Sequence, residues 1–128
     1  MNRLARSLLA FGLASAQVVA TAAVVSAAPD IKDRIAAIPG VRIISEGTSG
    51  TARTFVIGIR QPADHRKPRG LTFEQRFSLL HKAESKPMVL HTSGYNLSGP
   101  SPSEPTRLVD GNQISVEQRF FPPSRPAR

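Results

Sequence analysis

Residues 53–60 read RTFVIGIR, and this stretch decides the fold that we expect. In an extended chain Phe55, Ile57 and Ile59 point to one side, and Thr54, Val56 and Gly58 point to the other. A period of two is typical of a β-strand with one face against a core. Residues 72–82, TFEQRFSLLHK, alternate similarly and predict a second strand, antiparallel to the first across a proline-punctuated loop; a helix is the competing interpretation.

The sequence before this pair predicts a short helix and a further strand. Asp30 can cap a helix whose apolar face is Ile31, Ile35 and Ile38, and Pro39-Gly40 would end it. A strand over 41–45 follows, and the glycine-rich residues 47–50 predict a turn.

Two more strands are expected downstream. Residues 88–92 carry a continuous apolar run, which favours a strand buried on both faces in a mostly parallel sheet. Residues 98–105 are rich in proline and serine and predict no regular structure, whereas 110–112 predict a turn and 113–121 a fourth strand. Counted from residue 53, the pattern therefore predicts about four strands, preceded by the strand-like piece 41–45.

The first 28 residues have the layout of a secretory signal peptide. Arg3 and Arg6 precede an apolar stretch over 8–25, and small residues favour cleavage after Ala27 or Ala28. An uncleaved membrane anchor is the alternative. No second apolar stretch follows, so we expect a soluble, secreted protein without stable membrane insertion after cleavage.

The charge and the cysteine count exclude several classes of function. Cleavage after residue 28 would remove two of the 17 basic residues and none of the nine acids, lowering the formal charge from +8 to +6. These charges form no block of five and have few aromatic neighbours, so nucleic-acid binding has little support. With no cysteine, the chain has no disulfide, thiol nucleophile or thiolate metal site.

No catalytic centre is recognisable. The nucleophile turn of α/β-hydrolases has the form G-x-S-x-G, and neither 47–50 nor 94–99 has that spacing. His65, His81 and His91 lack metal-binding spacing, and we interpret Asp64-His65 as a solvated loop pair. We therefore expect no catalytic residue, metal or cofactor in this chain.

The best functional candidate is Ser93-Gly94-Tyr95-Asn96, because a glycine after a buried strand lets backbone N–H groups approach an acyl oxygen. An ordinary turn leaving the sheet is the alternative, and Asn96-Leu97-Ser98 also matches a glycosylation sequon. On the fourth predicted strand, Glu117 and Arg119 would share a face as a structural or site ion pair.

Five motifs, in order, carry a resemblance to a known family. They are Gln61-Pro62-x-Asp64-His65, Thr72-Phe73-x-Gln75-Arg76-x-x-x-Leu80-His81-Lys82, Thr92-x-Gly94-Tyr95-Asn96, Glu104-Pro105-Thr106-Arg107-x-Val109-Asp110-Gly111-Asn112-Gln113, and Glu117-Gln118-Arg119-Phe120-Phe121-x-Pro123-Ser124-Arg125-Pro126. Over about residues 30–126 this series resembles the amino-terminal part of secreted bacterial prolyl-type tripeptidyl and tetrapeptidyl aminopeptidases. The last motif is also similar, more distantly, to lysosomal proline-specific serine peptidases.

The resemblance implies a serine peptidase with an α/β-hydrolase fold that releases short peptides from free amino termini, often after proline. It places Gly94 and Tyr95 in the oxyanion-hole loop and the catalytic serine, aspartate and histidine beyond residue 128. Four strands in the order 1-2-4-3 would leave the third with an open apolar edge and both sheet faces uncovered. We therefore expect the isolated chain to aggregate, unstable and inactive.

Two other interpretations stay open. The chain could be a small secreted module whose basic surface binds anionic cell-wall polymers, without enzymatic activity. It could also be the product of a truncated or frameshifted gene.

Overall fold

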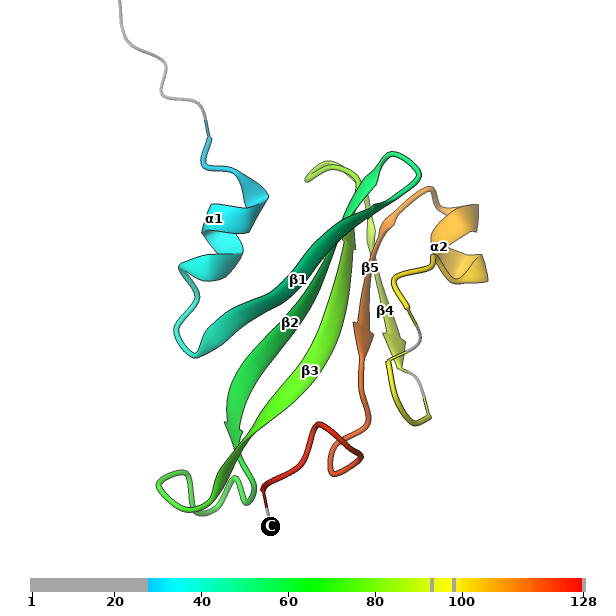
Figure 1. The fold of residues 1–128 in the computed structure, drawn as a ribbon. Helices are drawn as coiled ribbons and strands as arrows, with labels where there is room; N and C mark the ends of the chain where they lie inside the picture. Colours follow the sequence, from blue (N-terminus) through cyan, green and yellow to red (C-terminus); the bar gives the residue numbers. More distant parts are fainter. Residues whose placement is uncertain (1–27, 93, 98, 128) are drawn as a thin grey trace, which may run out of the picture.

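The computed structural model describes residues 28–92, 94–97 and 99–127 and contains one mixed sheet. Two short helices and five strands follow one another along the chain. They are α1 (Ile31–Ala36), β1 (Val41–Ser49), β2 (Ala52–Pro62), β3 (Thr72–His81), β4 (Met88–Thr92), α2 (Glu104–Leu108) and β5 (Asn112–Val116). The strand order is β1-β2-β3-β5-β4 (Figure 1). The predicted signal peptide lies almost entirely outside the described residues.

Strands β1, β2 and β3 form an antiparallel meander, as the alternation of residues 53–60 and 72–82 predicted. The helical alternative for 72–82 is therefore wrong. Strand β1 is longer than expected, because Gly47 lies within it and the turn falls at Gly50, whose φ is +60°. Glycine adopts that backbone conformation without a steric cost because it has no side chain.

The pairing of β4 corrects one prediction and confirms another. Among the described strands only β4 and β5 are parallel, so the expectation of a mostly parallel sheet is wrong. The expected order 1-2-4-3 is confirmed: β5 lies between β3 and β4, and the predicted strand 41–45 adds β1 outside β2. Strand β4 is consequently an edge strand, and its alternate residues are exposed instead of buried, with Leu90 at 67%.

The apolar core lies on one face of the meander, under α1. Ile35 of α1 packs against Phe55, Ile57 and Leu79. Partly buried apolar side chains surround this cluster; they are Ile31, Val41, Ile43, Phe77 and Ile114. This face is therefore covered at the meander, contrary to the expectation of two uncovered faces, although Ile38 lies beyond the helix and is exposed.

Ion pairs fix α1 to the β1–β2 hairpin. The Asp30 side chain accepts a hydrogen bond from Lys32 N (2.9 Å), which caps the helix as predicted. Arg53 donates to Asp30 (2.7 Å) and Glu46 (2.6 Å), and Lys32 also pairs with Glu46. The hydrogen bond from Arg53 lowers the pKa of Asp30, and those from Lys32 and Arg53 lower the pKa of Glu46.

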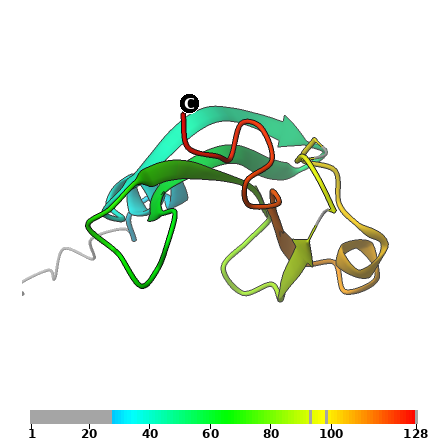
Figure 2. The same cartoon turned by 90° about the horizontal axis from the view of Figure 1, so that it is seen from below.

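Two predictions about the last third of the chain are wrong. Strand β5 ends at Val116 rather than continuing to residue 121, because Glu117 to Phe121 turn away and Phe120 has a φ of +68°. Residues expected to be irregular start α2, with a proline in its first turn, where no N–H is needed. The bent sheet has α1 near one end and α2 near the other (Figure 2).

Candidate functional site

The candidate site is the Gly94–Leu97 loop, which follows the carboxyl end of β4. A side-chain carbon placed on Gly94 would meet no other atom within 4 Å, so open space adjoins the backbone there. Tyr95 is 69% exposed, and its ring contacts the Phe121 ring edge-on with centroids 5.3 Å apart. Ser93 and Ser98, which belong to the predicted candidate and to the sequon, lie outside the described residues.

The segment Glu117–Ser124 holds this loop. Gln118 N donates to Tyr95 O (2.9 Å), and Leu97 N donates to Glu117 Oε1 (3.2 Å). The other carboxylate oxygen of Glu117 accepts a hydrogen bond from Ser124 Oγ, which itself accepts from Arg76 N (2.8 Å). The backbone of β3 and the Gly94–Leu97 loop are therefore connected through two side chains.

Arg119 binds the connection between β2 and β3. Its guanidinium donates to Gln61 Oε1 (2.8 Å), Pro62 O (3.1 Å) and Ala63 O (3.3 Å). It lies 3.0 Å from His65 Nε2 and stacks over the rings of Phe73 and Phe120. His65 therefore contacts Arg119, which the interpretation of Asp64-His65 as a solvated pair had missed.

The structure does not bring Glu117 and Arg119 together. Each side chain binds the partners described above. Among the ion pairs of the described residues, none joins Glu117 to Arg119. The ion-pair interpretation is wrong because it assumed a continuous strand through residue 121, whereas β5 ends before both residues.

Asn112 and Gln113 organise two loops on either side of β4, and the sequence analysis had missed both. Asn112 Oδ1 accepts from Lys82 N (2.7 Å) and Ala83 N (3.3 Å), while Nδ2 donates to Ala83 O and Lys86 O. Gln113 Oε1 accepts from Ser103 N (2.7 Å) and from Thr106 Oγ1. The signal was present in the sequence, since Asn112 ends the predicted turn and Gln113 begins the predicted strand.

Asp110 completes this arrangement electrostatically. Its carboxylate pairs with Lys82 and Lys86, and these hydrogen bonds lower the pKa of Asp110 to about 2. Gly111 is also required sterically, because a side-chain carbon there would lie 2.8 Å from Pro87 O. The motif Asp110-Gly111-Asn112-Gln113 therefore fixes the loops that flank β4.

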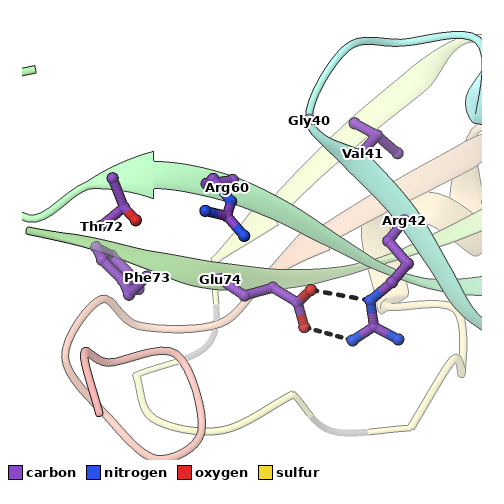
Figure 3. A pocket seen from close by; sticks show the side chains of 7 residues that line it. All are labelled: Gly40, Val41, Arg42, Arg60, Thr72, Phe73 and Glu74. Carbon is purple, nitrogen blue, oxygen red and sulfur yellow. Dashed lines mark hydrogen bonds and ion pairs between the residues drawn. The ribbon is translucent and has the colours of Figure 1, made fainter. Parts of the chain in front are cut away.

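A pocket of about 390 Å³ lies elsewhere, on strands β1 to β3 (Figure 3). Its lining residues are Gly40, Val41, Arg42, Arg60, Thr72, Phe73 and Glu74. Arg42 and Glu74 point toward each other across it and form a two-point ion pair, with N···O distances of 3.1 and 2.8 Å. No residue of the Gly94–Leu97 loop lines this pocket, so we do not place the site there.

The described residues offer few groups for other chemistry. Ser124 hydrogen-bonds a carboxylate, but it is fully buried and cannot meet a substrate. Within the ranges that the structure describes, no group of three or more His, Asp or Glu side chains could hold a metal ion. Neither of the helices in those ranges has the length and apolar character that crossing a bilayer requires.

Comparison with known proteins gives the family. The model of the PS-10 peptidase S37 family matches residues 24–128. The prolyl tri/tetrapeptidyl aminopeptidase of Streptomyces mobaraensis is 53% identical over 133 aligned positions, which cover 98% of this chain and 28% of that relative. No solved structure matches the chain. The chain thus spans little more than a quarter of the length of this curated relative, and it belongs to the PS-10 peptidase S37 family.

Proposed function

We propose that this chain is the amino-terminal part of a secreted serine aminopeptidase that releases tripeptides or tetrapeptides from free amino termini, often after proline. The observation that carries the proposal is the 53% identity, over nearly the whole chain, to a prolyl tri/tetrapeptidyl aminopeptidase. Secretion rests on the signal-peptide pattern of residues 1–28. The catalytic serine, aspartate and histidine would be supplied by polypeptide outside this sequence.

The sheet is consistent with an α/β-hydrolase core. In that fold a further parallel strand would lie beside β4, which has only β5 as a neighbour among the described strands. Helices that pack on the sheet face in that fold would bury the exposed Met88 and Leu90, as the apolar run of β4 suggests.

Within this enzyme, Gly94 and Tyr95 would belong to the oxyanion-hole loop. Their place after the carboxyl end of a parallel strand, beside open space, supports that role. The serine oxygen would attack the peptide carbonyl while a histidine takes its proton, and backbone donors would stabilise the negative oxygen. Water would then release the acyl group.

The alternative of a module that binds anionic polymers has less support. Many basic side chains are paired with carboxylates within the chain and are not directed at a partner. They include Lys32, Arg34, Arg42, Arg53, Lys82 and Lys86. This pairing reduces the positive potential that a polyanion would meet.

A chimera tests the proposal. The matched segment of the Streptomyces mobaraensis aminopeptidase would be replaced by residues 29–128 of this chain. We expect release of nitroaniline from a proline-ending tripeptide nitroanilide with a free amino terminus, no release from the acetylated peptide, and inhibition by a fluorophosphonate. The unaltered relative and the relative without the segment are the controls. A folded chimera that cleaves neither peptide, or both equally, would contradict the proposal.

The substitution Gly94→Ala tests the loop. A methyl group at Gly94 has open space within the chain, so it should leave the unfolding midpoint of the chimera unchanged. It would occupy the space into which the substrate carbonyl must come, so kcat should fall about tenfold or more. Gly99→Ala is the matched control, since a side-chain carbon at Gly99 also meets nothing within 4 Å. Equal activity of the two variants would remove Gly94 from the proposed site.

A further inference from the structure

Glu117 is the acidic side chain whose surroundings the proposed function leaves unexplained. It is only 3% exposed, and both of its carboxylate oxygens accept hydrogen bonds, from Leu97 N and from Ser124 Oγ. No lysine or arginine of the described residues forms an ion pair with it, and neighbouring Arg119 is bound elsewhere. A buried carboxylate without a cation is unfavourable for stability. Packing alone therefore gives no reason for a glutamate here.

The donors that Glu117 joins come from different parts of the molecule. Ser124 Oγ also accepts a hydrogen bond from Arg76 N, so the carboxylate oxygen that binds Ser124 is fixed to β3 in the meander. Gln75 Nε2 donates to Glu117 O and holds the backbone of the same residue. The remaining oxygen reaches Leu97 N, the last residue of the Gly94–Leu97 loop. Glu117 is therefore anchored on the rigid side and binds the loop on the other.

The loop also contacts the same segment through Tyr95. These contacts are the bond from Gln118 N to Tyr95 O and the ring contact with Phe121. The hydrogen bond between Leu97 N and Glu117 is made to a carboxylate. Hydrogen bonds to ionised groups are roughly twice as strong as neutral ones.

We propose that Glu117 is a positioning residue: its carboxylate sets the conformation of the Gly94–Leu97 backbone and so orients the donors that stabilise the reacting acyl oxygen. It acts through Leu97 N and touches no substrate itself. Its effect on catalysis rests on the proposed function, whereas its effect on the loop does not. Loss of the carboxylate should therefore lower kcat more than it raises KM, because misplaced donors weaken binding of the transition state and not of the ground state.

The test uses the chimera with Glu117→Gln, which keeps the side-chain size and removes the charge. Deuterium uptake over residues 94–97, kcat, KM and the unfolding midpoint are measured on the same preparations. We expect faster uptake at the loop, kcat lower by about tenfold or more, and KM within about twofold. Glu104→Gln, at the exposed start of α2, is the matched control and should change none of these quantities.

Ser124→Ala gives an independent check, because it removes the anchor and leaves the Glu117 carboxylate in place. It should raise uptake at 94–97 in the same direction as Glu117→Gln. Unchanged uptake at the loop in Glu117→Gln overturns the inference, whether or not the chimera is active. A fall in kcat that merely follows a lower unfolding midpoint, with no local change in uptake, also overturns it. Faster uptake in a chimera that is inactive without substitution would support the positioning role and count against the proposed function alone.

Discussion

The β1–β2–β3 meander and the β5–β4 pair are stabilised by different interactions. In the meander, α1 covers a cluster of Phe55, Ile57 and Leu79, and exposed ion pairs surround it. Around β5 and β4, buried polar side chains such as Asn112, Gln113 and Glu117 bind loop backbone instead. The meander has a core of its own, whereas the β5–β4 pair positions loops and leaves an apolar edge exposed. Stability and the candidate site are therefore concentrated in separate halves of one sheet.

The largest expected effect concerns the open edge of β4. The purified chain from residue 29 should self-associate through this edge, and Leu90→Lys should shift it to a monomer, since charged residues block edge pairing. Sedimentation velocity measures the difference. Leu71→Lys is the control, because Leu71 is 64% exposed but lies outside the strands. A wild-type chain that is already monomeric would show that β4 is not an adhesive edge.

The next effect concerns the core of the meander. In the Leu90→Lys background, Leu79→Ala should lower the free energy of unfolding by about 2–5 kcal/mol, because Leu79 is 7% exposed and packs on Phe55 and Ile35. Urea unfolding provides the value. Leu71→Ala should cost no more than about 0.5 kcal/mol as an exposed substitution. Similar losses for the two variants would contradict a core confined to the α1 face.

A smaller effect is expected where polar side chains hold the loops. Asn112→Ala removes four hydrogen bonds to the backbone of residues 82–86 and should cost about 1–3 kcal/mol. Hydrogen exchange should accelerate at the amides of Lys82 and Ala83 while β2 stays protected. Asn112→Asp, which keeps the accepting oxygen, should restore protection at Lys82. Faster amide exchange throughout the sheet, β2 included, would contradict the separate stabilisation of the meander and the β5–β4 pair.

The smallest effect is electrostatic. Lys82 and Lys86 lower the pKa of Asp110 to about 2 in the folded state, whereas in the unfolded chain it is about 4. The ionised carboxylate therefore stabilises the folded state. This contribution is present above the unfolded pKa and is lost as the pH falls toward 2. The stability difference between wild type and Asp110→Asn should therefore be largest above about pH 5 and shrink below it. Urea unfolding at several pH values measures it, with Asp33→Asn as control; a difference independent of pH would be the contrary result.

Much of the fold could be predicted from local patterns, and the exceptions have physical causes. The alternation of Phe55, Ile57 and Ile59 predicted β2, and Asp30 predicted the start of α1. The apolar run of β4 led to the wrong prediction that this strand is buried. Such a run shows that a strand can be buried, but it does not show whether another segment covers it. The alternation after Val116 misled likewise, since Glu117 and Arg119 leave the sheet to bind loop groups.

The candidate site was predicted only in part. A glycine after a strand marked the Gly94–Leu97 loop, but the groups that hold it lie far along the chain. Glu117 reaches Leu97 over 20 residues, and Arg119 reaches Gln61 over 58. No local pattern encodes such partners, since a buried polar side chain can be satisfied by any group that the fold brings near it.

By itself, the sequence determined the strands, the first helix and membership of a peptidase family, because alternation, capping and ordered motifs are written in neighbouring residues. Only the tertiary structure decided which face of β4 stays exposed, where β5 ends and which backbone groups Glu117, Arg119 and Asn112 bind. Those outcomes depend on contacts between distant segments, and the free energy of such a contact exists only once the chain has brought both partners together.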